Sequence, residues 1–359
     1  MRCAMPKKRL PANRSLPKRW RFKHGAYRYR VPPGLESLWE GKQEFTLGVT
    51  YAEACRVWSE RLNRDGRSLQ TLGQVMDRYL LEVSPDKAYK SQQSDQYNMQ
   101  KLRPVFGHMP IASIKPRHAY KYHDLARQKH GLTAAKHAIQ TLRHLLTKAV
   151  EWGLINRNPL LGQVRIASAP ARDRLVEDWE ISEALTMRAN SRGPVVAKAY
   201  MRFKLMTGLR RNDILSLSLV DLKDDGIHVQ PSKTRKTTGK RLIIEWDEDG
   251  ELKKVVDEIQ AIPPRRIGHA PLFVTRQGKS YVDEQGRCNA FDSLWQRFMD
   301  KVLQTTKVVN RFQERDLRAK VASESGSLQE ASERLGHAST AITQRVYRRK
   351  PVRVKPLVR

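Results

Sequence analysis

Cysteine is scarce in this sequence. Its 359 residues include only Cys3, Cys55 and Cys288, with no Cys-x-x-Cys pair and no Cys/His spacing suited to a metal ion. A disulfide framework or a structural zinc site is therefore not expected, and the low cysteine content fits a reducing compartment. We expect no metal ion and no other cofactor.

Long apolar runs are also missing. No segment approaches the roughly eighteen uninterrupted apolar residues of a transmembrane helix. The basic first ten residues are not followed by the apolar stretch that a secretory signal requires. We therefore expect a soluble protein of the cytoplasm, with no membrane partner.

Negative charge is in short supply. Lys and Arg number 68 against 37 Asp and Glu, and the net charge of +31 is spread from end to end. Because such self-repulsion does not favour folding, a polyanionic partner explains it best. A ribosomal-type protein and a membrane-surface binder are the alternatives. The 39% hydrophobic content and the lack of a basic amphipathic anchor favour globular domains that bind nucleic acid.

The first predicted domain, residues 1–65, is small and basic. Aromatic and cationic residues alternate around His24-Gly25, which predicts a hairpin, with a third strand over 42–47 and a helix over 51–62. Such a sheet can enter a DNA groove, although an ordinary solvated sheet with a basic rim is the alternative. The DNA-contact candidates in this sheet are Arg19, Arg21, Lys23, Arg28 and Arg30.

The second predicted domain, residues 66–166, is helical. One amphipathic stripe runs through 72–79 and another through 139–150, while prolines and a glycine between them are expected to break the chain into short helices. Cations on the polar faces suit a module lying on DNA phosphates, although a solvated face is the alternative. The DNA-contact candidates here are Lys90, Lys101, Lys136 and Arg143.

A linker over 167–174, with Pro170 in its middle, precedes a third predicted domain, residues 174–359. This domain is expected to be mainly helical, with an antiparallel strand pair at 227–229 and 242–244 and helices over 252–259 and 290–304. The fold class predicted is multidomain α+β. It comprises a small N-terminal β-sheet domain, a helical domain, and a mainly α domain with a small antiparallel sheet.

Four separated motifs in the third domain carry polar chemistry. In the first, Thr-Gly-Leu-Arg at 207–210 places Arg210 at a glycine turn before a helix, where exposed amides and the helix dipole favour a phosphate. In the second, Lys233 follows a strand in the loop of the strand pair. A lysine at such a tip can give a proton to a leaving oxygen. We prefer Lys233 to Lys236 because Ser-Lys-Thr directly follows the strand.

The third motif, residues 315–318, places Arg315 and Arg318 three residues apart on a helix, where they are expected to share a face. Two guanidinium forks aimed at one spot suit the equatorial oxygens of a phosphorane. The fourth motif, Leu-Gly-His at 335–337, brings His337 and then Tyr347 near the same C-terminal helices. Each motif alone is weak, because isolated residues of these types usually serve packing or face water.

Together the four motifs resemble the tyrosine recombinase family, and phage-type integrases in particular. The family pattern has an arginine after Thr-Gly-Leu, a hairpin lysine, a His-x-x-Arg box, a Leu-Gly-His box and a tyrosine about ten residues later. The resemblance covers the whole chain and implies arm-type DNA binding for 1–65, core-type binding for 66–166 and catalysis for 174–359. The matching residues, in chain order, are Arg210, Asp213 as an acidic support, Lys233, Arg315, Arg318, His337 and Tyr347.

This resemblance implies that Tyr347 cuts and rejoins DNA through a 3′-phosphotyrosyl link, with double-stranded DNA at core and arm attachment sites as substrate and a homotetramer on that DNA. The setting implied is the cytoplasm of a bacterial host, where a phage or mobile element integrates or is excised. A host DNA-bending protein and an excision factor are accessory partners of many members.

One position departs from the pattern. Arg315 stands where the family usually has histidine. Arginine stays protonated near neutrality, so it can stabilise phosphate charge but is a poor general base. A non-catalytic DNA-binding or architectural protein with the same fold, and a type IB topoisomerase-like enzyme, are the alternative functions.

Overall fold

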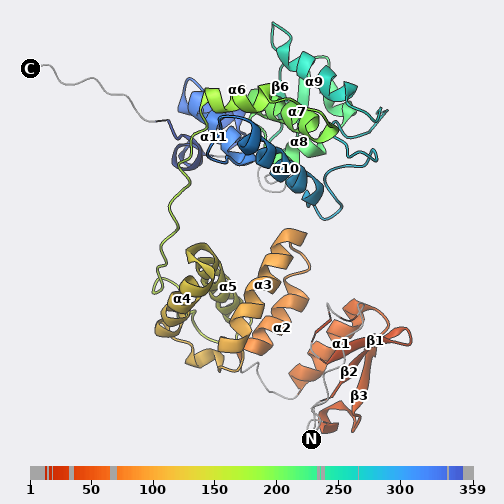
Figure 1. Ribbon diagram of the computed structural model, residues 1–359. Helices are drawn as coiled ribbons and strands as arrows, with labels where there is room; N and C mark the ends of the chain where they lie inside the picture. Colours follow the sequence, from red (N-terminus) through yellow and green to blue (C-terminus); the bar gives the residue numbers. More distant parts are fainter. Residues whose placement is uncertain are drawn as a thin grey trace, which may run out of the picture. The chain divides into compact units, whose positions relative to one another are not determined.

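The computed structural model describes residues 13, 16–17, 19–31, 36–64, 71–232, 235, 239–265, 267–337 and 339–350. Lys233 and Lys236 lie outside these residues. The chain divides into two compact units, residues 1–169 and 170–359 (Figure 1). The division falls inside the predicted linker.

The first unit begins with an antiparallel sheet in the order β1-β2-β3, covered by helix α1 (Figure 1). Its elements are β1 (Trp20–Lys23), β2 (Ala26–Arg30), the 3₁₀ turn η2 (Glu36–Trp39), β3 (Glu44–Gly48) and α1 (Tyr51–Arg64). His24 and Gly25 both adopt positive φ, as a tight two-residue hairpin requires. The cross-strand pair Trp20 and Tyr29 faces a small core against α1. The predicted hairpin, third strand and helix are confirmed.

The rest of the first unit is helical and has its own apolar core. Its elements are α2 (Leu72–Glu82), α3 (Tyr89–Phe106), η3 (Ile111–Ser113), α4 (Pro116–His130) and α5 (Leu132–Glu151). Both predicted stripes are buried, on α2 and α5, apart from the half-buried Val150 at the end of the second. The expectation of breaks at every proline was wrong at Pro104, which lies inside α3. The helix continues to Phe106 despite the hydrogen bond that proline removes, because Leu102 and Phe106 on either side of Pro104 are buried in the core.

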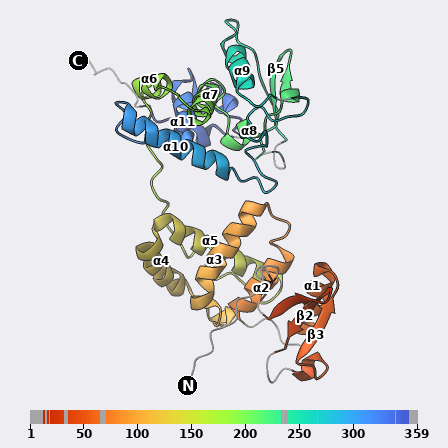
Figure 2. The same cartoon turned by 45° about the vertical axis from the view of Figure 1, so that its right-hand side comes forward.

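The second unit packs its helices around α7, which contacts α9, α10 and α11 (Figure 2). Its sheet has the antiparallel order β4-β5-β6, and Val229 pairs with Leu242 in the predicted strand pair. The elements are α6 (Asp178–Thr186), α7 (Arg192–Thr207), α8 (Arg211–Ser216), η4 (Leu219–Asp221), β4 (Leu222–Lys223), β5 (Gly226–Val229), β6 (Leu242–Ile244), α9 (Glu251–Ala261), α10 (Asn289–Thr305), α11 (Glu314–Glu324), α12 (Leu328–Arg334), α13 (Thr340–Ile342) and the π-helical turn η5 (Thr343–Tyr347).

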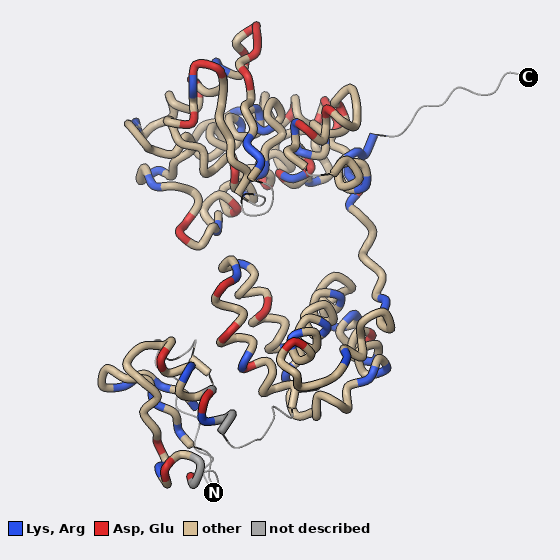
Figure 3. Tube along the Cα trace, turned by 180° about the vertical axis from the view of Figure 1, so that it is seen from behind, with Lys and Arg blue, Asp and Glu red and all other residues tan. Residues whose placement is uncertain are grey.

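This architecture confirms the predicted fold class, a small N-terminal sheet and a helical part followed by a mainly α unit with a small antiparallel sheet. Lys and Arg occur in every part of the chain rather than in one tail (Figure 3). Among the described residues, no helix combines the length and the apolar character needed to cross a bilayer.

Candidate functional site

The first motif forms a tight turn between α7 and α8. Gly208 ends α7 in the left-handed conformation, with φ of 64°, and its N–H donates to the Lys204 carbonyl. A Cβ atom at Gly208 would lie 3.0 Å from Val321 Cγ1, so α11 approaches this turn closely. Arg210 follows as the N-cap residue of α8. The predicted glycine turn before a helix is therefore present.

Arg318, on α11, is the centre of the site. Its side chain is 3% exposed, and its guanidinium donates to the Gly208 carbonyl at 2.6 Å and to the Leu335 carbonyl at 2.7 Å. It also lies 3.1 Å from Nε2 of His337. The planar guanidinium of Arg318 thus joins the turn before Arg210 to the turn before His337. It can do so because its donors are fixed in one plane.

The contacts of His337 fix its tautomer. A guanidinium can only donate, so Nε2 of His337 accepts from Arg318 and the imidazole is neutral. The proton then lies on Nδ1, which donates to Oγ1 of the buried Thr343 at 2.7 Å. This assignment follows from the hydrogen-bond partners. His337 therefore presents an acceptor, not a donor, toward Arg318.

Tyr347 meets Arg318 and His337 within a single chain. Its ring centroid lies 5.3 Å from Cζ of Arg318 and 4.9 Å from the His337 ring centroid. Burial, together with the neighbouring charge of Arg210, lowers the pKa of Arg318 to about 10, although Tyr347 and Asp213 partly oppose this shift. Arg318 is thus still a cation near neutral pH, aligned with the predicted nucleophile.

Asp213 ties the first motif to the second. Its Oδ1 accepts from the backbone N–H of Ser232 at 2.9 Å and from the Ser232 hydroxyl at 2.7 Å. Its Oδ2 lies 3.9 Å from Nη1 of Arg210, which is an ion pair rather than a hydrogen bond. Ser232 immediately precedes Lys233, so this buried carboxylate fixes the start of the loop that carries the predicted lysine.

Arg315 is placed differently from Arg318. It is exposed in the first turn of α11, and it makes no hydrogen bond or ion pair with any residue that the structure describes. The preceding Glu314 instead pairs with Lys204, a side chain only 1% exposed on α7. Burial lowers the pKa of Lys204 despite the opposing effect of Glu314. The two arginines were expected to point at one spot, but they do not, because Arg318 is buried and Arg315 is exposed.

Two family models match the chain. Residues 175–352 match the model of the phage integrase family, and residues 71–124 match the model described as "Phage integrase, N-terminal SAM-like domain". Together they cover well over half of the sequence. The chain belongs to the phage integrase family. Its members are tyrosine recombinases. A comparison with curated proteins found no match to the sequence.

Solved structures of other phage integrase family members share the fold. A lambda integrase tetramer bound to a Holliday junction has a TM-score of 0.64 at 20% identity, covering 96% of this chain and 99% of that chain. A lambda integrase dimer bound to a COC′ core site gives 0.62 at 19% identity, with 95% and 99% covered. The Tn1549 transposon integrase with transposon right end DNA gives 0.61 at 15% identity, with 76% and 93% covered.

The DNA-contact candidates of this family member differ in how far they are already engaged. Arg19, Lys23, Arg30 and Lys90 are exposed, and Arg28 is half-buried. Arg21 is exposed but pairs with Glu44, and Lys101 lies over the Tyr97 ring. Lys136 donates to Ser168, and Arg143 donates to the Val164 carbonyl. The last two side chains therefore help to hold the segment that follows α5.

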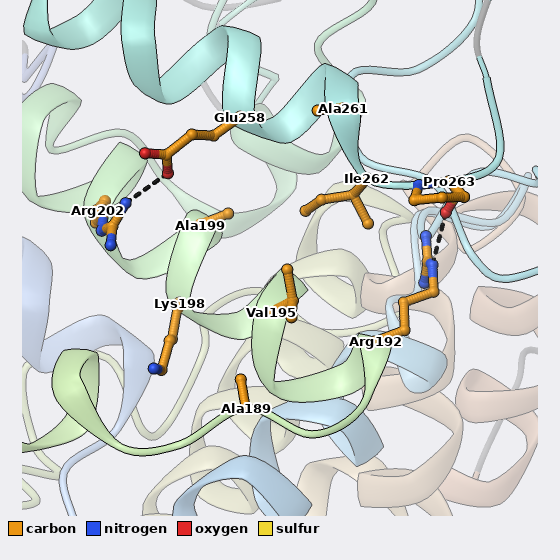
Figure 4. Close-up of a pocket in the computed structure, with 10 residues that line it drawn as sticks. All are labelled: Ala189, Arg192, Val195, Lys198, Ala199, Arg202, Glu258, Ala261, Ile262 and Pro263. Carbon is orange, nitrogen blue, oxygen red and sulfur yellow. Dashed lines mark hydrogen bonds and ion pairs between the residues drawn. The ribbon is translucent and has the colours of Figure 1, made fainter.

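A pocket elsewhere in the second unit is lined by none of the predicted site residues (Figure 4). It has a volume of about 550 Å³ and lies between α7 and α9. Arg202 pairs with Glu258 at its rim, and Arg192 donates to the Pro263 carbonyl. No group of three His, Cys, Asp or Glu side chains suited to a metal ion occurs in the part of the chain that is described.

Sequence reasoning missed a second polar cluster beside the site. Asp316 lies between Arg315 and Arg318, is fully buried, and accepts hydrogen bonds from Arg172 and Arg349. Its partners are distant in sequence, so no local motif indicates the contact. The capping pattern at the start of α11 indicates an acid that accepts from the N-cap backbone, but it gives no sign of the two arginines or of the burial.

Proposed function

We propose that the chain is a site-specific integrase that cuts and rejoins DNA through a 3′-phosphotyrosyl intermediate. The oxygen of Tyr347 bonds to the scissile phosphorus while the bond to the 5′-oxygen breaks. Covalent capture conserves the energy of the phosphodiester, so rejoining needs no nucleotide cofactor. The observation that carries this proposal is the contact of Tyr347 with the buried Arg318 and His337 in one chain.

The cations supply electrostatic stabilisation. Arg318 and Arg210, supported by Asp213, offset charge that develops on the nonbridging oxygens. Arg315 adds to this field once DNA brings a phosphate to the exposed start of α11. Lys233 protonates the departing 5′-oxygen, which is otherwise a poor leaving group.

The phenolic proton of Tyr347 needs an acceptor, and Arg315 cannot serve as one. Nε2 of His337 carries a lone pair close to the tyrosine ring, and this lone pair accepts from Arg318. A nonbridging phosphate oxygen that takes over this N–H of Arg318 would free the lone pair for the proton of Tyr347. We infer that His337 takes this proton and becomes an imidazolium. It then donates to a nonbridging phosphate oxygen, so one side chain acts first as base and then as donor.

The remaining parts of the chain serve DNA binding and assembly. Residues 1–65 bind arm-type sites, residues 66–166 bind the core site, and residues 174–359 catalyse exchange between duplexes in a homotetramer. The lambda integrase structures, one a dimer on a core site and one a tetramer on a Holliday junction, support this proposal by their shared fold. The substrate is the attachment DNA of a phage or mobile element in a bacterial host cytoplasm, with a host bending protein and an excision factor as accessory partners.

The test uses the crossover sequence obtained by sequencing recombinant junctions formed in cells that express the chain. A nicked duplex with this sequence loses a short fragment on cleavage, which traps the covalent complex. We expect the full chain to form the adduct and the Tyr347→Phe variant to form none while binding DNA equally well. Adducts that survive this substitution would refute the role of Tyr347. Absence of both recombinant junctions and adducts would favour the non-catalytic alternative, and plasmid relaxation without recombinant junctions would favour a topoisomerase.

A further inference from the structure

The proposed chemistry leaves one buried acid without a role. Asp316 is 0% exposed in the interior of the second unit, on the same helix as Arg318. Its Oδ2 accepts from the backbone N–H of Gln313 at 2.8 Å, which caps α11. A cap needs only this one bond, and residues at N-terminal positions of helices usually face water. The burial of Asp316 therefore has another cause.

Two arginines from distant segments bury this carboxylate. Nε of Arg172 lies 2.9 Å from Oδ1 and 3.1 Å from Oδ2 of Asp316. Nη1 of Arg349 lies 2.7 Å from the same Oδ1. Arg172 belongs to the linker that enters the second unit, and Arg349 follows Tyr347 by two residues. One carboxylate thus joins the linker, α11 and the tyrosine segment.

Arg349 is itself fixed at both ends. Its side chain is 8% exposed, and its Nη1 also donates to the Arg174 carbonyl of the linker at 2.7 Å. Its backbone N–H donates to Oγ of the buried Ser323 at 2.8 Å, and that oxygen lies 3.1 Å from the carbonyl of Tyr347. The backbone on the C-terminal side of Tyr347 is therefore held against α11.

We propose that Asp316 and Arg349 form a clamp that positions Tyr347 over Arg318 of its own chain, and that Arg172 couples this clamp to the linker. The proposal rests on the proposed function, because it concerns the reach of the nucleophile. Asp316, Arg349 and Arg172 are positioning residues, since they act through the backbone of the tyrosine segment. A change of linker conformation that withdraws Arg172 weakens the hold on the tyrosine.

The physical basis is preorganisation. In-line attack requires the phenol oxygen within a few tenths of an ångström of its productive place, and a misplacement of about 1 Å costs about 100-fold in rate. The π-helical turn at Thr343–Tyr347 ends at the tyrosine itself, so the backbone that follows is held by Arg349 through Ser323 and Asp316. A buried charge-assisted pair supplies the missing rigidity.

The test measures the first-order rate of covalent complex formation at saturating suicide duplex, together with the Kd for the same DNA and the thermal midpoint. Arg349→Ala is expected to slow the rate about 10- to 100-fold with Kd changed by less than about twofold. Arg349→Lys keeps a cation on Asp316 and is expected to recover most of the rate. Arg348→Ala is the matched control, because it removes the exposed neighbouring cation and leaves the clamp intact.

A double-mutant cycle separates the clamp from general destabilisation. Asp316→Asn combined with Arg349→Ala is expected to be no slower than the slower single variant, within about twofold, because both remove one interaction. Arg172→Ala is expected to slow the same step and to add nothing to Asp316→Asn. Additive effects would overturn the clamp, and a normal rate for Arg172→Ala would overturn its link to the linker.

The outcomes also distinguish this proposal from the proposed function. If the unmodified chain forms no Tyr347-dependent adduct, the proposed function fails. If that adduct forms and Arg349→Ala forms it at the unmodified rate, the clamp alone is refuted. If Arg349→Ala loses DNA binding or its thermal transition, Asp316→Asn takes its place, and an unmodified adduct rate for that variant likewise refutes the clamp.

Discussion

A single arginine sets the geometry of the site at the residue scale. The guanidinium of Arg318 donates to three acceptors at once. These are the carbonyls of Gly208 and Leu335 and Nε2 of His337. Lysine has no planar fork, so it cannot hold these three acceptors in one plane. The same contacts keep His337 neutral, and its Nε2 can act as a base for Tyr347 once a phosphate oxygen replaces it as the acceptor of the Arg318 N–H.

The separate roles proposed for Lys233 and His337 predict different responses to the leaving group. Replacing the scissile 5′-oxygen by sulfur gives a thiolate leaving group, whose conjugate acid has a pKa of about 8.5 and which needs no proton. We expect this substrate to restore adduct formation by Lys233→Ala but not by His337→Ala. Rates on matched oxygen and sulfur duplexes measure the effect, and equal rescue of both variants would refute the assignment of His337 as base.

At the scale of elements, two glycine turns bring the helix ends to Arg318. Gly208 and Gly336 both adopt positive φ, and a Cβ atom at Gly336 would lie 2.9 Å from Leu242 Cδ1 on β6. Each turn therefore needs glycine for its conformation and for the close approach of a neighbouring element. These turns, not the helices themselves, place the acceptors of Arg318.

Gly208→Ala is expected to cost about 1 to 3 kcal/mol from backbone strain, and more from the contact with Val321. Gly268→Ala is the matched control, because Gly268 has φ of 60° with no atom within 4 Å of a Cβ. We expect Gly208→Ala to lower the thermal midpoint further and to slow adduct formation. Equal effects of the two substitutions on both measurements would show that the close approach to α11 has no role.

Local patterns in the sequence predicted the elements well where side-chain periodicity decides them, as in the β1-β2 hairpin, α5 and the β5-β6 pair. Pro104 was misjudged because the core contacts of Leu102 and Phe106, which hold the helix together around it, depend on tertiary packing. In the site, the motifs predicted the meeting of Arg318, His337 and Tyr347. Motif spacing could not reveal that Arg315 is exposed, since orientation on α11 depends on tertiary packing.

The contacts of Asp316 and Arg349 were beyond sequence reasoning for a related reason. The two residues are 33 positions apart and pair only because α11 and the segment after η5 fold together. Neither the sequence around Asp316 nor the basic segment around Arg349 contains a local pattern that predicts a buried ion pair. Such pairs are visible only in the folded chain.

At the scale of the whole molecule, the excess of positive charge is carried by both units. The small sheet and the helical part have separate apolar cores within the first unit. Changes in the sheet that spare its core should therefore leave the chemistry of the second unit unaffected. Phosphate contacts then add to affinity independently of the cleavage step.

Salt dependence tests this separation. Each phosphate contact contributes about −0.9 to the slope of log K against log salt concentration. We expect Lys23→Ala combined with Arg30→Ala to reduce the slope on arm-type DNA by up to about 2 while core-site cleavage is unchanged. Lys253→Ala with Lys254→Ala removes the same charge from α9 and is expected to leave the arm-site slope unaltered. A slope insensitive to the first pair would contradict an arm-binding role of β1 and β2.

The covalent bond between Tyr347 and DNA can be identified directly. The trapped complex of the unmodified chain with the suicide duplex is digested with protease and nuclease, and the joined peptide and nucleotide are sequenced by mass spectrometry. We expect one adduct, in which the Tyr347 oxygen is bonded to a 3′-phosphate and the released strand ends in a 5′-hydroxyl. An adduct on another residue, or a link to a 5′-phosphate, would contradict it.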